Sequence, residues 1–203
     1  MQKDRDLLEA VTDLERRIRE SDARLARVSR SSRLSDGDVR GSLREITEAA
    51  CEILALARSS VWVYGPDQRS IRCLDLFVAA EATHDAGTEL FAADFPGYFE
   101  ALKSERSIAA ADAHTDPRTR EFSVPYLAPL GIGAMLDAPI RVGGRMIGVL
   151  CNEHVGQARP FTVLEEHLAG VLADYVAIAV LSSERKSAEE QLRVLAEELE
   201  RLA

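Results

Sequence analysis

Apolar residues recur at alternating spacings of four and three positions near both ends of the chain, which is the a/d pattern of a coiled coil. The N-terminal series is Leu7, Val11, Leu14, Ile18, Leu25 and Val28, with Ser21 at its one polar position. The C-terminal series is Leu181, Ala188, Leu192, Leu195, Leu199 and Leu202, interrupted by Arg185. The pattern predicts coiled-coil helices over residues 1–34 and 182–203, whose seams hold two copies together as a parallel homodimer.

A stretch rich in Ser, with one Gly, over residues 29–38 separates the first coil from a second amphipathic helix, because such residues have low helix propensity. The second helix begins near residues 35–38, and its apolar face consists of Leu43, Ile46, Ala50, Ile53, Leu54 and Ala57. From Thr162 onward the pattern predicts one long helix. Its first half faces the domain with Leu164, Leu168, Val171, Leu172, Tyr175 and Ile178, and its second half carries the C-terminal seam. A central domain over residues 38–181 is therefore expected between two helical extensions.

Within the central domain the pattern changes to short runs of β-branched and aromatic residues bounded by turn residues, which is typical of strands. Strands are expected at residues 59–64, 70–78, 108–113, 134–142 and 145–155. The run PGYFEALKSE at residues 96–105 predicts a short helix, and a long connection follows the third strand. Strands of this kind with helices at both ends indicate an α+β fold.

The last two strands form a hairpin, because the two-residue Gly-Gly loop at residues 143–144 favours a tight turn with positive φ angles. A regular hairpin pairs Leu136 with Cys151 and directs both toward the helices, since alternate residues of a strand share a face. Asp137 and Asn152 then lie on the opposite face. The run C-N-E-H that ends the hairpin alternates between the two faces, so it is a strand end rather than a reaction centre. We expect Cys151 to be buried and unreactive.

A candidate small-molecule pocket lies on the sheet face away from the coils, under the segment between Phe91 and Tyr126. Aromatic walls with a few polar groups are the usual composition of such sites. The candidate residues are Phe91, Tyr98, Asp112, Phe122, Tyr126, Met135, Asp137, Leu150 and Asn152. Two alternatives stay open: the aromatic residues would serve equally as a second core that covers the sheet, and Asp112 would serve equally as a cap of its own loop.

Composition and charge narrow the function classes. The net charge of −9 gives no attraction to nucleic acid or to anionic membranes, so neither is an expected partner. No apolar run reaches the ~18 residues of a membrane-spanning helix, so membrane insertion is not expected. The three cysteines are widely spaced and form no CxxC motif, which favours a reducing, cytoplasmic location.

Four strings carry a family resemblance: DFPGYFEAL, DAHTDPRTREF, YLAPLGIGAMLDAPI and GVLCNEHVG. In this order they resemble the GAF domains that precede histidine kinase or diguanylate cyclase outputs in bacterial signalling proteins. The resemblance spans about residues 38–181. It implies a six-stranded antiparallel sheet with the terminal helices on one face, a small-molecule pocket on the other, and coiled-coil extensions at both ends. Fold alone does not identify a ligand.

The resemblance allows known GAF ligands to be tested against the sequence. Cyclic-nucleotide-binding members carry an N-K-x-x-F-x-x-x-D-E signature, which is absent here. Bilin-binding members usually attach the pigment through a pocket cysteine, often followed by histidine, and none of the three cysteines precedes a histidine. Neither ligand is expected, and the cofactor stays unidentified. The haem-ligand role stays open for His84, His114 and His154, and no residue spacing indicates a metal site.

Three classes of function remain. The favoured one is a dimeric sensory module that passes a signal through its flanking helices to an output domain. The second is a redox enzyme similar to the GAF group that reduces methionine sulfoxide, but the cysteines form no reactive pair. The third is a structural spacer that only dimerises. The sequence contains no catalytic triad, phosphate loop or paired-carboxylate motif, so the chain itself is not expected to be an enzyme.

Overall fold

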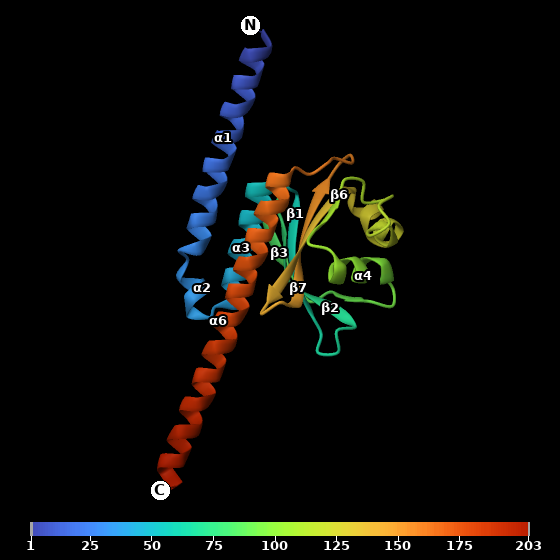
Figure 1. Cartoon of the computed structure of the whole chain (residues 1–203). Coiled ribbons are helices and arrows are strands. Elements are labelled where there is room, and N and C mark those ends of the chain that lie inside the picture. The colour runs from blue at the N-terminus through green and yellow to red at the C-terminus, as the bar shows by residue number, and fades with distance from the viewer. Residues whose placement is uncertain (1, 203) are drawn as a thin grey trace.

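The computed structural model describes residues 2–202, which form one antiparallel sheet between two layers of helices and loops (Figure 1). Six strands follow one another across the sheet in the order β3-β2-β1-β7-β6-β5, and the short β4 also pairs with β2. Their bounds are β1 Arg58–Tyr64, β2 Ser70–Val78, β3 Thr83–Asp85, β4 Glu89–Phe91, β5 Ile108–Ala110, β6 Ile132–Val142 and β7 Arg145–Val155. The expected α+β fold with a six-stranded antiparallel sheet is confirmed.

The helices divide between the two faces of the sheet. They are α1 Gln2–Ser29, α2 Ser32–Asp36, α3 Val39–Leu54, α4 Pro96–Ser104, α5 Ala128–Leu130 and α6 Val163–Leu202, with a 3₁₀ turn η1 Arg120–Phe122 and a π turn η2 Ser123–Leu127. Helices α3 and α6 cover one face, and α4 lies on the other (Figure 1). We call α4, η1, η2, α5 and their connecting loops the lid, and the sheet face beneath them the lid face.

Local chemistry sets the bounds of α3. The Asp38 side chain accepts a hydrogen bond of 3.0 Å from the backbone N–H of Gly41, which caps the first turn. The helix ends at Ala55, whose φ of 51° is left-handed and turns the chain into β1. The break expected around residues 29–38 is present, because α1 ends at Ser29 and α2 is a separate short helix.

The sheet separates two hydrophobic cores. The helix-side core joins α3 and α6 to the sheet through residues such as Ile46, Leu136, Leu150, Leu172 and Val176. The lid-side core contains Tyr98, Leu102, Phe122, Leu127, Met135, Val149 and Cys151 among others. Both faces of the central strands are therefore buried, which is the reason that β6 and β7 read as nearly continuous apolar runs.

The register predicted for the β6–β7 hairpin is wrong beyond its first two pairs. Val142 pairs with Arg145 and Arg141 with Met146, but Ile140 then pairs with Gly148. Ile147 is left over as a β-bulge, which shifts the later pairs by one residue as far as Ala134 with His154, before a second irregularity at Gly133. Because side chains alternate between faces, this single extra residue moves all later side chains of β7 to the opposite side from the one expected.

The structure consequently corrects three face assignments. Cys151 pairs with Asp137 and lies in the lid-side core, not on the helix face. Leu150 and Asn152, expected on the lid face, belong to the helix side: Leu150 packs in the helix-side core, and Asn152 donates from Nδ2 to the Leu136 carbonyl at 2.9 Å. The expected burial of Cys151 is confirmed on the other face of the sheet.

The N-terminal heptad stripe is divided between solvent and the protein's own core. Leu25 and Val28 are buried in the helix-side core, and Ser21 is buried as well. Leu7, Val11, Leu14 and Ile18 stay exposed further up α1. The expectation that the whole stripe is free for a second copy is therefore wrong for Leu25 and Val28. Among the described residues, no helix is both long enough and apolar enough to cross a lipid bilayer.

At Gly148, which pairs with Val63, the bulged hairpin lies against β1 with no room for a side chain. A Cβ at this position would lie 2.1 Å from the carbonyl oxygen of Trp62, and backbone cannot move aside as a flexible side chain can. We predict that Gly148→Ala lowers the free energy of unfolding by about 2–3 kcal/mol in urea denaturation.

The matched control is Gly170→Ala in α6, where nothing in the chain lies within 4 Å of the added Cβ. Both variants are compared at concentrations at which the chain is monomeric, so that contacts between copies do not enter the result. That variant should leave stability unchanged or raise it by up to about 1 kcal/mol, because alanine is the better helix former. Equal effects of the two substitutions would contradict the close approach at Gly148.

Candidate functional site

A buried polar cluster lies between the lid and the centre of the sheet. Tyr98 comes from α4, Asp137 from β6 and Cys151 from β7. The Tyr98 hydroxyl donates to Asp137 Oδ2 at 2.7 Å and lies 3.3 Å from Cys151 Sγ. Tyr98 is 1% exposed and Asp137 is fully buried. The bulge brings the three groups together, because it places Cys151 on the same face as Asp137.

Asp137 is the exceptional member of the cluster. Its second oxygen, Oδ1, has no hydrogen-bond partner in the described structure, although it is buried. Burial raises the pKa of Asp137 to about 7, with the hydrogen bond from Tyr98 acting in the opposite direction. A buried carboxyl group is costly to ionise without full hydrogen bonding. Asp137 therefore titrates near neutral pH, and it can either donate as an acid or accept as a carboxylate.

A second polar group lies beside the first on the lid face. Arg58 Nε of β1 donates to Glu153 Oε2 of β7 at 2.8 Å, and Arg58 Nη2 donates to the Tyr126 hydroxyl at 3.3 Å. Burial raises the pKa of Glu153, and the neighbouring charge of Arg58 opposes the rise. The pair links the edge of the lid at η2 to two central strands. Removal of Arg58 would leave a buried carboxylate without its partner.

The lid-side core is filled by aromatic rings around these polar groups. Phe95 stacks on Phe122 with ring centroids 4.2 Å apart, and Tyr98 meets Phe122 edge to face at 4.9 Å. Phe122 and Met135 are each 3% exposed, and Tyr126 is partly buried against the same core. Five of the candidate pocket residues are thus gathered where the lid meets the sheet: Tyr98, Phe122 and Tyr126 on the lid, and Met135 and Asp137 on β6.

The other candidate residues lie elsewhere. Phe91 is at the end of the edge strand β4 and is 49% exposed. Asp112 caps its own loop, accepting from the backbone N–H of His114 at 3.1 Å and from the Thr115 hydroxyl at 2.8 Å. These bonds hold the pKa of Asp112 below its usual range, the Thr115 bond contributing most. Leu150 and Asn152 are on the helix side, as described above.

Sequence reasoning missed Arg58 as the partner of Glu153, and it missed Cys151 and Glu153 as neighbours of Asp137. One signal could have found them, namely Gly148 within an apolar strand, since an isolated strand glycine often marks a bulge or a close backbone approach. A bulge placed there moves Cys151 and Glu153 to the lid face together.

The three candidate haem histidines lie apart from one another. His84 of β3 points its two ring nitrogens at Asp75 and Glu48, each at 3.0 Å. His114 Nδ1 lies 2.8 Å from the Ser123 hydroxyl, and His154 sits near the end of β7. In the part of the chain that the structure describes, no three His, Cys, Asp or Glu side chains gather as metal ligands do.

Comparison with known families decides the classification. Residues 38–180 match the GAF domain family. The chain belongs to this family. GAF domains are typically regulatory modules rather than catalysts. Burial raises the pKa of the Cys151 thiol beside Tyr98 and Asp137 well above its usual value, so this thiol stays protonated at neutral pH. A comparison with curated proteins gave no match.

Solved GAF structures share the fold at low sequence identity. A bacteriophytochrome from R. palustris, RpBphP3, matches with a TM-score of 0.65 and 14% identity. The match covers 88% of this chain but only 40% of the bacteriophytochrome. The GAF domain of a phosphoenolpyruvate-protein phosphotransferase from Coxiella burnetii matches with a TM-score of 0.65 and 17% identity, over 85% of this chain and 96% of that one. Residues 122 to 287 of a methyl-accepting chemotaxis protein match with a TM-score of 0.65 and 20% identity, over 81% and 99%.

The raised pKa of Asp137 predicts a pH dependence of stability. The folded protein holds this proton between about pH 4 and 7, while the unfolded chain has lost it. The contribution of Asp137 to the free energy of unfolding therefore falls as the pH rises through this window. Asp137→Asn removes the titration, so the variant should gain stability relative to the parent from pH 4 to 8, by on the order of 2–4 kcal/mol at pH 8.

Asp112→Asn is the matched control for this measurement. Because the pKa of Asp112 is lowered in the folded protein, this variant should lose stability relative to the parent as the pH rises through its acidic titration. Urea denaturation at several pH values measures both variants. A stability difference for Asp137→Asn that does not change with pH would contradict the raised pKa.

Proposed function

We propose that this GAF domain is a dimeric sensory module that relays a signal between its two projecting helices. The observation that carries the proposal is their direction. Helix α1 enters from one end of the domain, α6 leaves from the other, and both run the same way along it (Figure 1). The domain thus lies between an entering helix and a leaving helix. A conformational change within the domain can therefore alter the position or rotation of α6.

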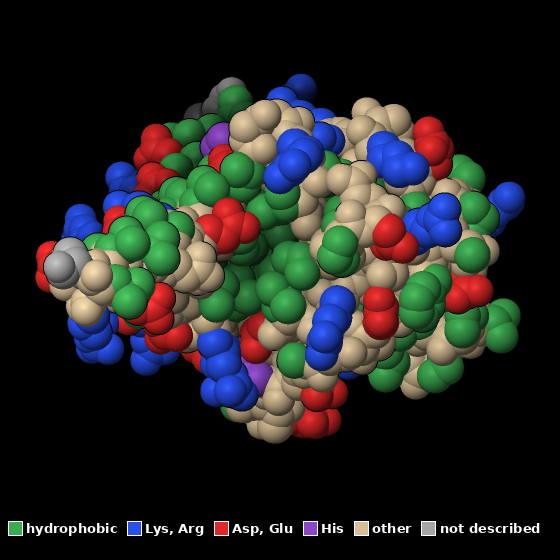
Figure 2. All heavy atoms as spheres, turned by 90° about the horizontal axis from the view of Figure 1, so that it is seen from below, with side chains coloured by type: hydrophobic (Ala, Val, Ile, Leu, Met, Phe, Trp, Pro, Cys, Tyr) green, Lys and Arg blue, Asp and Glu red, His purple; other side chains and the backbone are tan. Residues whose placement is uncertain are grey.

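Exposed apolar stripes on both projections support a parallel homodimer. Leu14 of α1 is 46% exposed, and Leu192 and Leu199 of α6 are 67% and 61% exposed. Seen from the end at which α6 leaves, apolar side chains also gather in a hollow between the projecting helix and the rest of the domain (Figure 2). Matching a/d residues of two parallel chains cover one another. Short coils are marginal alone, so each draws stability from the domain it joins.

The proposed input is the cluster beneath the lid. A small molecule that binds between the lid and the sheet would meet the unpartnered oxygen of Asp137. Tyr98, Phe122, Tyr126 and Met135 would form the walls of that site. The strand β6 offers a direct route onward, because Leu136 and Ala138, which flank Asp137, pack in the same core as α6. A displacement of Asp137 therefore reaches the exit helix through one strand.

The proposed output is a separate domain or protein of the histidine kinase or diguanylate cyclase kind, which must itself be dimeric to use two parallel exit helices. The chain would contribute regulation and no catalysis. Three free, buried cysteines fit a reducing, cytoplasmic setting.

A structural spacer is the second candidate function, and the packing under the lid favours it. The stacked rings of Phe95 and Phe122 occupy the space where a ligand would bind. In a spacer the cluster at Asp137 would serve only to fix the lid on the sheet, and the exit helices would keep one geometry.

The dimer is tested by changing the C-terminal seam. We predict that Leu192→Asp with Leu199→Asp gives monomers in analytical ultracentrifugation, because four carboxylates would meet across the two-fold axis. The matched control is Ser187→Asp with Val194→Asp, which adds the same charge at exposed positions off the seam and should leave the dimer intact. Dimers of equal stability in both variants would rule out the C-terminal seam as the interface.

The relay is tested by the distance between the two exit helices. Spin labels at Ser187 of each chain report this distance by electron resonance, in a background without the native cysteines. Titration of Asp137 from pH 6 to 8 should change the distance distribution in the parent, and Asp137→Asn should abolish the change. A distribution that is the same at every pH and in the variant would favour the spacer.

A further inference from the structure

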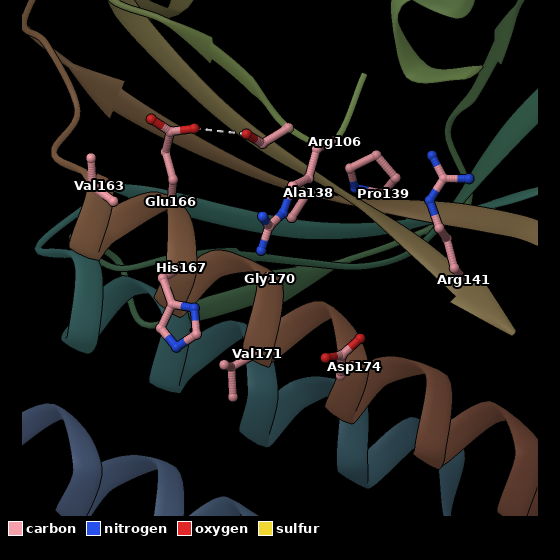
Figure 3. A pocket seen from close by; sticks show the side chains of 11 residues that line it. Arg106, Ala138, Pro139, Arg141, Val163, Glu166, His167, Gly170, Val171 and Asp174 are labelled. Atoms are coloured by element: carbon pink, nitrogen blue, oxygen red, sulfur yellow. Dashed lines mark hydrogen bonds between the residues drawn. The ribbon is translucent and has the colours of Figure 1, made fainter. Parts of the chain in front are cut away.

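A cleft of about 590 Å³ lies on the outer side of α6, away from α3 and beside the β5–β6 edge of the sheet. Its helix wall contains Glu166, Gly170, Val171 and Asp174, and its sheet wall contains Arg106 and Arg141 (Figure 3). The proposed relay from β6 to α6 leaves this cleft without a role.

The helix wall of the cleft is in phase with the C-terminal heptad seam. Stepping back from Leu181 by alternating three and four residues gives Ile178, Asp174, Val171 and His167. The last three line the cleft, and Ile178 is 46% exposed although the sequence pattern directed it at the domain. One continuous stripe of heptad positions thus runs along α6 from the cleft to the C-terminal end. The α6 helix of a second copy that packs along this stripe would therefore also lie at the cleft.

Gly170 provides an independent indication that another backbone comes close here. Glycine within a helix costs about 1 kcal/mol relative to alanine. Nothing in the chain lies within 4 Å of a Cβ built at Gly170, so intrachain packing does not require the glycine. A small residue on an exposed helix face permits the close approach of a second helix.

The charges of the two walls are complementary. Arg141 on the sheet wall lies across the cleft from Asp174 on the helix wall (Figure 3). In the described part of the chain the carboxylate of Asp174 has no hydrogen bond or ion pair, whereas Glu166 already accepts from the Ser107 hydroxyl at 2.8 Å. A two-fold axis parallel to α6 keeps residues at the same height, so it would bring Arg141 of each copy to Asp174 of the other.

We infer that the cleft is half of an isologous interface with a second copy of this chain. The α6 helices approach at Gly170, and Arg141 of each protomer pairs with Asp174 of its partner. This inference rests on the proposed parallel dimer and extends its interface from the coil onto the domain. It also removes the repulsion of two Asp174 side chains that the seam would otherwise bring together.

A mixing experiment tests the pairing. Asp174→Arg alone places arginines opposite each other twice in its homodimer, and Arg141→Asp alone places aspartates opposite each other twice. Each variant should therefore dimerise at least about 10-fold more weakly than the parent, since like charges across an interface oppose binding. An equimolar mixture should form heterodimers of parental affinity, because both pairs then have opposite charges. Pairing within one chain cannot produce this rescue.

Two further variants, one control and one direct test of the helix contact, complete the experiment. Arg72→Asp, an exposed reversal on β2, should leave the dimer unchanged. Gly170→Gln should weaken the dimer while circular dichroism shows an intact fold. Parental affinity of the single variants, or a mixture no tighter than its components, would overturn the inference even if the seam variant Leu192→Asp with Leu199→Asp is monomeric. A monomeric parent protein would instead overturn the proposed dimer itself.

Discussion

The close contact of β7 with β1 at Gly148 determines how the rest of the domain is organised. The bulge beside it sorts the side chains of the central strands between two environments. One set, including Leu136 and Leu150, packs against α3 and α6, and the other, including Asp137 and Cys151, faces the lid. A hairpin without the extra residue would put Cys151 among the helices and Asn152 under the lid, so neither core would have its present composition.

The sequence pattern was sufficient for the elements and the fold class, because both depend on local periodicity. Strands β1, β2, β6 and β7 and helices α4 and α6 lie where the pattern predicted them within a few residues. The short strands β3 and β4 were missed because three-residue edge strands have no periodicity of their own. The site was predicted only in part: Tyr98 and Asp137 were found, but their neighbours depended on a single bulged residue, and Asp112 proved to be a loop cap.

The two buried polar groups on the lid face, the Arg58–Glu153 pair and Asp137, differ in how their charges are compensated. Arg58 and Glu153 neutralise each other, with Tyr126 as a third partner. Asp137 accepts a hydrogen bond from the hydroxyl of Tyr98, but no cation faces it and its oxygen Oδ1 has no partner in the described structure. The first arrangement fixes the lid in place, whereas the second leaves a group whose charge responds to its surroundings.

The N-terminal helix α1 carries one apolar face that is exposed at its upper end and buried at its lower end. Ile18 is exposed above the domain, while Leu25 and Val28, on the same face two and three turns later, are buried in the core. A helix of 28 residues is about 42 Å long and resists twisting. Leu25 and Val28 anchor the lower end of α1 in the core beside α3. A rotation of α1 as a rigid body would therefore move these two side chains against α3.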